Sequence, residues 1–207
     1  MLVTPAGMGK SYRPKDHYFQ KAKRQGFRAR SAFKIEEIAD RFGVLGRGAH
    51  VLDLGAAPGG FLQVIADAVG PEGRVTGVDV VEIRPLGLPN VQTAPLDVLA
   101  DDFDARLALL DPGPFDVVVS DLAPRTTGIK STDQARSIRL ATRALEIARQ
   151  RGREGSSFIA KLFMGGDFEA FRDEVRRSYA EVKVVRPEAT RGGSAEVYLV
   201  GLRKKAA

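Results

Sequence analysis

The sequence predicts an α/β protein with a mostly parallel sheet that helices cover on both faces. Short apolar runs typical of buried strands alternate with segments of helical spacing along most of the chain. The first of these runs breaks into a glycine-rich turn that leads into a helix. The last two runs lie too close together for a crossover helix, so they should pair antiparallel or occupy neighbouring positions in the sheet.

The order of helices and strands follows from the apolar spacing. Two helices are expected first, at 14–25 and 31–42, the second with Phe33, Ile35 and Ile38 inward. Strands are expected at 49–54, 74–79, 90–94, 115–120, 156–163, 181–186 and 196–202. Further helices are expected between them, at 60–69, 102–110, 132–151 and 167–179. We expect a flexible start over 1–13 and a single domain over 14–205, whose first part, 14–43, is a basic helical extension that binds RNA.

Composition limits the class of protein. At 207 residues the chain is long enough for one domain with a full core. It has no cysteine, which excludes disulfides, thiolate metal sites and every mechanism that needs a cysteine nucleophile. No apolar run approaches the roughly 18 residues that span a membrane, and the first residues lack the apolar core of a secretion signal. We therefore expect a cytoplasmic protein without a membrane partner.

Positive charge is concentrated near the N-terminus. The net charge is +6, and the stretch from Lys10 to Lys34 holds nine basic residues against one acid, Asp16, with aromatic residues between them. Such a segment beside a nearly neutral domain is typical of proteins that bind nucleic-acid phosphates. The alternative is a helix face that only serves solubility. We expect RNA contacts from five residues, outside the edge of the sheet that holds the glycine-rich turn: Lys21, Lys23, Arg24, Arg28 and Arg30.

The glycine-rich turn lies within residues 51–61, VLDLGAAPGGF. Glycines at a strand-to-helix turn let the backbone approach a ligand closely, because no Cβ intervenes. Ala57 and Pro58 stand where a dinucleotide site has its second glycine, and Asp53 would lie badly beside phosphates. A carboxylate there suits a ligand with positive charge or with hydroxyl and amino donors, and S-adenosylmethionine has all of these. A glycine turn of an ordinary α/β domain is the alternative.

Charged residues and glycines also stand at the carboxyl ends of the predicted strands, where open parallel sheets bind ligands. They follow five strand runs: Asp53 and Gly55, Asp79, Asp97, Asp121 and Lys161. Asp79 comes 24 residues after Gly55, close to the spacing of a carboxylate that accepts from ribose hydroxyls. Each residue alone could cap a helix or end a strand, but together they predict a ligand site along this edge.

Five sequence blocks, in order along the chain, resemble the FtsJ-like family of ribose 2′-O-methyltransferases: RARSAFK at 28–34, VLDLGAAPGGF at 51–61, VSDLAP at 119–124, IAKLF at 159–163 and EVYLV at 196–200. The resemblance implies a Rossmann-like S-adenosylmethionine-dependent methyltransferase fold, with a seven-stranded sheet whose last strand is antiparallel. It also implies a catalytic set: Lys34, Asp121, Lys161 and Glu196. The implied S-adenosylmethionine site comprises Gly59, Phe61, Asp79, Asp97 and Asp121, beside Asp53 and Gly55 of the turn.

The resemblance further implies methylation of the ribose 2′-hydroxyl of a uridine in large-subunit (23S) ribosomal RNA, within the large subunit or its precursor, by a monomer that uses no metal. Lys161 is the expected base, with Lys34 as a neighbouring cation and two carboxylates orienting the amine; alternatively, Lys161 only steers the hydroxyl. Three other functions stay open: methylation of transfer RNA or another RNA, RNA binding without catalysis, and a nicotinamide-dependent oxidation.

Overall fold

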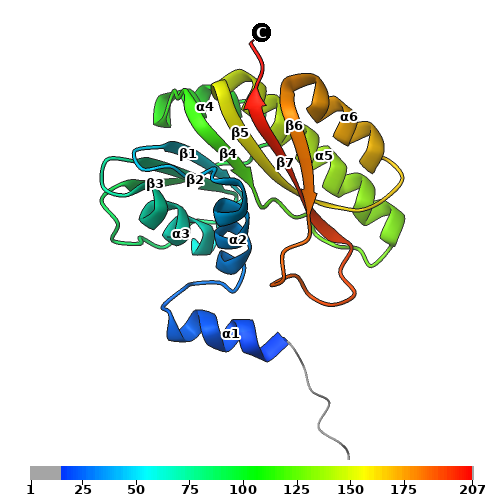
Figure 1. The fold of residues 1–207 in the computed structure, drawn as a ribbon, viewed down its shortest axis with the longest axis horizontal. Helices are drawn as coiled ribbons and strands as arrows, with labels where there is room; N and C mark the ends of the chain where they lie inside the picture. The colour runs from blue at the N-terminus through cyan, green and yellow to red at the C-terminus, as the bar shows by residue number, and fades with distance from the viewer. Residues whose placement is uncertain (1–14, 207) are drawn as a thin grey trace, which may run out of the picture.

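A computed structural model describes residues 15–206, so the flexible start expected over 1–13 lies outside the described residues. Within that part of the chain, seven strands form one sheet in the order β3-β2-β1-β4-β5-β7-β6 (Figure 1). The strands are β1 (His50–Leu54), β2 (Arg74–Asp79), β3 (Val91–Pro95), β4 (Phe115–Ser120), β5 (Gly152–Phe163), β6 (Tyr179–Val185) and β7 (Glu196–Lys204). Strand β7 runs antiparallel to both of its neighbours. The predicted sheet, with its antiparallel last strand, is confirmed.

Helices cover both faces of the sheet (Figure 1). The helices are α1 (Lys15–Arg24), α2 (Ala32–Phe42), α3 (Gly60–Val69), α4 (Phe103–Leu110), α5 (Lys130–Arg151) and α6 (Phe168–Ser178). One buried apolar cluster joins the sheet to α2 and α3 through residues such as Ile35 and Ile65. A second cluster joins the other face to α4, α5 and α6 through residues such as Leu145 and Phe171.

Most boundaries agree with the expected ones to within one or two residues, but β5 starts earlier than predicted. It begins at Gly152, directly after α5, and its register with β4 shifts between Phe115 and Val117. The residues at 153–155 are exposed, so no apolar run marked this part of the strand in the sequence. The pairing of Gly152 with Phe115 of β4, a tertiary contact, extends β5 toward its N-terminal end.

The antiparallel insertion of β7 determines which residues meet at the ligand edge. Parallel strands bring their last residues to one edge of a sheet, whereas an antiparallel strand brings its first residue there. Glu196, the first residue of β7, accordingly pairs with Phe163, the last residue of β5. This topology places Glu196 at the edge formed by the carboxyl ends of β1, β2 and β4.

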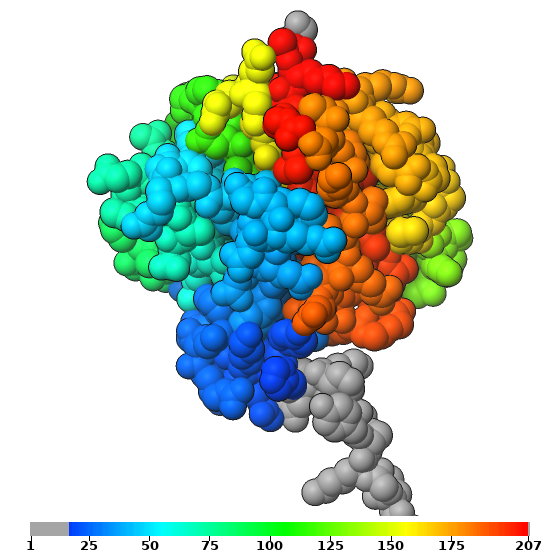
Figure 2. Space-filling view, in the orientation of Figure 1, coloured from blue at the N-terminus to red at the C-terminus, as the bar shows by residue number. Residues whose placement is uncertain are grey.

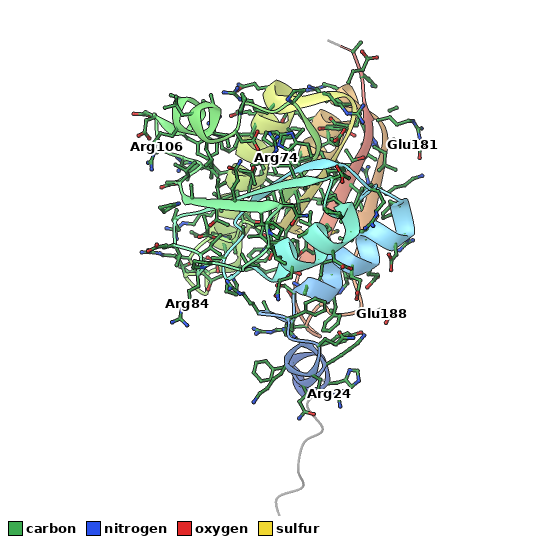
Figure 3. All side chains as sticks on the ribbon, turned by 90° about the vertical axis from the view of Figure 1, so that its left-hand side faces the viewer. Arg24, Arg74, Arg84, Arg106, Glu181 and Glu188 are labelled. Atoms are coloured by element: carbon green, nitrogen blue, oxygen red, sulfur yellow. The ribbon has the colours of Figure 1, made fainter. Side chains whose placement is uncertain are left out.

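The basic helix α1 lies at the same end of the molecule as this edge. Figure 3 shows Arg84, which follows β2, near this end together with Arg24 and Glu188, whereas Arg74 at the start of β2 lies toward the other end. In Figure 2 the dark blue α1 segment lies beside the orange segment that follows β6. A small cluster that includes Ala22, Phe33 and Ala189 joins them. Among the described residues, no helix has the length and apolar character needed to cross a membrane.

Candidate active site

The alternation of side chains along strands brings several candidate residues to one face of the sheet. Lys161 of β5 lies directly opposite Tyr198 of β7. Glu196 precedes Tyr198 by two residues, so these three side chains share a face. Apolar residues of that face pack under α2 and α3, and Lys34 of α2 is buried against the same face.

Two ion pairs hold the predicted catalytic residues in place. Lys161 Nζ lies 3.0 Å from Asp121 Oδ1 and donates to the main-chain oxygen of Asp121 at 2.6 Å. Lys34 Nζ pairs with Glu196 Oε1. Both lysine side chains are only 8% exposed. Each buried ammonium group is therefore matched by one carboxylate, as buried charges require.

Tyr198 connects the two ion pairs, although it was not among the predicted site residues. Its Oη donates to Asp121 Oδ1 at 2.6 Å, and Lys34 Nζ lies 5.7 Å from the centre of its ring. Burial, followed by the carboxylates of Asp121 and Glu196, raises the pKa of Tyr198 well above its ordinary value. The hydroxyl therefore remains a donor, and the four predicted catalytic residues form one cluster around it. Its position in the EVYLV block, two residues after Glu196, was the available signal in the sequence.

Asp53 lies deeper in the same region, and its carboxyl group has no hydrogen-bond partner in the described part of the chain. Its side chain is fully buried in β1, and neither carboxyl oxygen has a hydrogen-bond partner among the described residues. Burial chiefly, and then the carboxylates of Asp121 and Asp79, raise the pKa of Asp53 well above its usual range, while Lys161 acts in the opposite direction. A buried carboxyl without partners costs stability unless it is neutral or meets a ligand. The site therefore has an acceptor available for a cationic or hydroxyl donor.

The turn after β1 is shaped for close approach of its backbone to other groups. Gly55 has a φ of 81°, and a Cβ added there would lie 2.9 Å from the main-chain nitrogen of Leu122. Asp79, at the end of β2, accepts hydrogen bonds from the main-chain N–H of Ala57 at 3.0 Å and of Val81 at 2.9 Å. Asp79 thus holds the glycine-rich turn and the segment after β2 together. Its carboxylate oxygens retain lone pairs for ligand hydroxyls.

A cavity of about 450 Å³ lies between these two segments. Its lining residues are Arg28, Ala57, Pro58, Val81, Glu82, Ile83 and Arg84. The predicted cofactor residues themselves are not among these lining residues. Phe61 belongs to the first turn of α3 and is buried in the core. Gly59, with a φ of 107°, directly precedes α3. Asp97 is exposed after β3, where its Oδ1 accepts a hydrogen bond from the N–H of Leu99.

All five predicted RNA-binding residues are exposed or partly exposed. Lys21, Lys23 and Arg24 occupy the last turn of α1. Arg30 lies close to Arg191 and Glu196; burial and then the neighbouring Arg191 lower its pKa. Arg191 was not predicted from the sequence, because it belongs to the connection between β6 and β7, far along the chain from Arg30. These two guanidinium groups extend the positive surface of α1 toward the cluster.

Arg28 departs from the prediction. The expectation that the whole basic segment lies outside the glycine-turn edge is wrong, because Arg28 Nη1 donates to the carbonyl of Pro58 within that turn at 3.2 Å. The same guanidinium donates to the carbonyls of Arg84 at 2.5 Å and Pro85 at 2.6 Å. The chain between α1 and α2 passes directly over the start of α3, an arrangement that sequence spacing does not reveal.

Known proteins are similar to this chain in sequence and in fold. The chain matches the FtsJ-like methyltransferase family over residues 27–204. It belongs to that family. A relative named ribosomal RNA large subunit methyltransferase E, from Myxococcus xanthus, is 68% identical over 206 residues, which cover 100% of this chain and 97% of the relative. A protein of the same name from Anaeromyxobacter dehalogenans is 55% identical, over 94% of this chain and 73% of its own length.

Solved structures support the methyltransferase fold. A Plasmodium falciparum protein assigned as a ribosomal RNA methyltransferase has a TM-score of 0.77 at 23% identity, covering 87% of this chain and 100% of the other. At that identity the likeness concerns the fold. The match to the family model begins at residue 27, after α1, whereas the Myxococcus xanthus relative also covers α1.

Proposed function

We propose that this protein transfers a methyl group from S-adenosylmethionine to the ribose 2′-hydroxyl of a uridine in 23S ribosomal RNA, within the large subunit or its precursor in the cytoplasm. The observation that carries the proposal is the connected cluster of Lys34, Glu196, Tyr198, Asp121 and Lys161 at the ligand edge. The names of the relatives supply the class of substrate. Because the match covers 97% of the first relative, we extend the activity in its name to the whole of this chain.

The residues along the edge fit S-adenosylmethionine. When bound, that cofactor supplies a methyl group made electrophilic by the attached sulfonium. Asp53 offers a buried carboxyl without partners in the described part of the chain, which suits a ligand with cationic groups. Asp79 and Asp97 offer acceptors for hydroxyl and amino donors, and Gly55 allows the close approach of the turn. Gly59 and Phe61, at the start of α3, are proposed to support the same site.

Lys161 is proposed to hold the reacting ribose hydroxyl. Its nitrogen has three bonding positions besides the side-chain carbon, and Asp121 occupies two of them, through Oδ1 and the main-chain oxygen. The remaining position is free to meet the hydroxyl and, in the neutral amine, to take its proton as the oxygen becomes a nucleophile. Tyr198 shares the Asp121 oxygen and so restricts the direction of that remaining position. Positioning of this kind lowers the entropic part of the barrier.

The positive surface beside the cluster is proposed to receive the RNA backbone. Arg30 and Arg191 approach the Lys34–Glu196 pair, where a phosphate next to the target ribose would lie. Lys21, Lys23 and Arg24 continue this surface along the last turn of α1. Each phosphate contact of this kind adds affinity that falls with salt.

The proposal is tested by mapping 2′-O-methyl groups in ribosomal and transfer RNA from cells with and without the gene, by mass spectrometry. One 23S uridine should lose its methyl group in the deletion strain, and purified protein with S-adenosylmethionine should restore it on large subunits from that strain. Loss of a methyl group from transfer RNA only would assign a different substrate to the same chemistry. Unchanged methylation in both RNA classes would contradict the proposal.

A further inference from the structure

We infer that Arg28 is a positioning residue of the 450 Å³ cavity beside the proposed cofactor site, and that it sets affinity for the cofactor and not affinity for RNA. The inference rests on the proposed function, because the walls of this cavity are the glycine-rich turn and the segment after Asp79, which adjoin the cofactor residues proposed above. It separates Arg28 from the other basic residues of the N-terminal segment, whose charge it shares.

The hydrogen bonds of the Arg28 guanidinium are all with the protein backbone. It donates to Pro58 in the glycine-rich turn and to Arg84 and Pro85 in the segment after β2. A guanidinium presents its N–H donors in a rigid planar fork, so it can hold two segments at a fixed spacing. Donors occupied by three carbonyl oxygens are no longer available to a phosphate. These hydrogen bonds therefore favour a role of Arg28 in holding the protein backbone over a role in binding RNA phosphates.

The backbone around Arg28 is also docked on the start of α3. The Gln63 side chain brackets this segment: its Oε1 accepts from the N–H of Arg28 at 2.8 Å, and its Nε2 donates to the carbonyl of Gly26 at 3.0 Å. A Cβ at Gly60 would lie 3.0 Å from the Cβ of Ala29. The glycine at position 60 thus admits the basic segment itself, in addition to any role toward a ligand.

The two segments that Arg28 joins are the two walls of the 450 Å³ cavity. Asp79 holds the same walls at another point, through the N–H groups of Ala57 and Val81. Two side chains therefore hold the walls together: the Asp79 carboxylate accepts from N–H groups of both walls, and the Arg28 guanidinium donates to carbonyls of both walls. Without Arg28 the Asp79 hydrogen bonds and the apolar packing of Ile83 remain, but the spacing of the walls becomes less defined. A looser cavity binds its ligand more weakly, because binding must then also order the walls.

Lys23 provides a matched control. It is exposed in the last turn of α1, and its side chain makes no hydrogen bond or ion pair with another residue of the described range 15–206. Arg28→Gln and Lys23→Gln each remove one positive charge from the same basic segment. A difference between the two variants therefore reports on the hydrogen bonds of Arg28 and not on the charge of the segment.

The experiment measures S-adenosylmethionine affinity by calorimetry and RNA affinity as a function of salt. Arg28→Gln should weaken cofactor binding by about tenfold or more, since it removes several hydrogen bonds from a charged group, and should leave the salt dependence of RNA binding unchanged. Lys23→Gln should keep cofactor affinity and lower the log–log salt slope by roughly 0.7–0.9. Arg28→Lys keeps the charge but lacks the fork, so it should also weaken cofactor binding. In turnover, KM for the cofactor should rise while KM for RNA stays constant.

Hydrogen exchange of the free protein separates a local effect from unfolding. In Arg28→Gln, amides of residues 55–60 and 80–86 should exchange faster while those of the central strands keep their rates; Lys23→Gln should change neither. If Arg28→Gln keeps wild-type cofactor affinity and lowers the salt slope as Lys23→Gln does, the inference is overturned and Arg28 is a phosphate ligand. If the wild type itself fails to bind S-adenosylmethionine, the proposed function is overturned together with the cofactor role of Arg28.

Discussion

Tyr198 donates its hydroxyl hydrogen to the same carboxylate oxygen of Asp121 that pairs with Lys161, at 2.6 Å and 3.0 Å respectively. The ring of Tyr198 meanwhile lies 5.7 Å from the Lys34 ammonium. One fully buried side chain thus links two ion pairs that come from four separate segments of the chain. The hydroxyl of Tyr198 thus holds the carboxylate that pairs with Lys161, and its ring lies beside Lys34.

Tyr198→Phe removes one hydroxyl and leaves the ring in place. Losing a hydrogen bond to a charged partner costs roughly 1.5–3 kcal/mol, so single-turnover methyl transfer should fall by about tenfold or more. S-adenosylmethionine affinity, measured by calorimetry, should stay close to wild type because the hydroxyl faces Asp121. A variant with the wild-type rate would show that Asp121 is oriented by Lys161 alone.

Lys161→Ala should abolish methyl transfer and leave the binding of S-adenosylmethionine and RNA near wild type, because the proposed role of Lys161 is confined to the reacting hydroxyl. Lys161→Arg should be nearly as inactive, since a guanidinium does not lose its proton at usable pH and has the wrong shape for a point contact. The measurement is single-turnover transfer of labelled methyl groups to ribosomal particles. Retention of more than about a tenth of the rate corresponds to less than roughly 1.4 kcal/mol of barrier and would assign the base to another group.

Asp79→Ala should weaken S-adenosylmethionine binding at least about tenfold, through loss of a charged acceptor worth roughly 1.5–3 kcal/mol. The variant also releases the N–H groups of Ala57 and Val81, which Asp79 now holds. Asp79→Asn keeps one acceptor oxygen and should lose less affinity. Calorimetry that gives wild-type affinity for the Ala variant would remove Asp79 from the site.

Arg30→Gln and Arg191→Gln should weaken RNA binding and reduce its salt dependence, by roughly 0.7–0.9 of log–log slope for each phosphate that is no longer neutralised. Neither residue is among the proposed cofactor residues or the lining of the 450 Å³ cavity, so cofactor affinity should be unchanged. Filter binding of ribosomal RNA at several salt concentrations gives the slope. An unaltered slope in the double variant would indicate that this positive surface serves solubility only.

Asp53→Asn should increase the free energy of unfolding at neutral pH, with a gain that shrinks as the pH falls. Burial, with Asp121 and Asp79, raises the folded-state pKa of Asp53 above its unfolded value. The folded protein then binds more protons than the unfolded chain between the two pKa values, so the wild type loses stability as pH rises through that window. Below the unfolded pKa both states carry the proton and the difference disappears. Urea unfolding at several pH values tests this; a constant difference would indicate that ionisation of Asp53 is not its origin.

The fold could be predicted from the sequence because its signals are local. Apolar runs bounded by glycines and charges located the strands and helices, and the short connection between the last two strands indicated that they pair antiparallel or lie at neighbouring positions in the sheet. The polar ligand edge was also visible, since residues such as Asp53, Asp79 and Asp121 lie at or directly after the carboxyl ends of their strands. Each of these signals lies within a few residues of the feature that it predicts.

The interactions across the site were decided by the tertiary structure. The insertion of β7 between β5 and β6 brings Tyr198 opposite Lys161 and gives Lys34 its carboxylate partner, Glu196, 162 residues away. The passage of the basic segment over α3 brings the Arg28 guanidinium to the carbonyls of Pro58 and Pro85, which local sequence signals did not indicate. Composition and spacing specify that a side chain is charged and which element carries it. Whether that charge meets a phosphate or a carbonyl depends on which distant backbone packs beside it, and only the packed chain determines that.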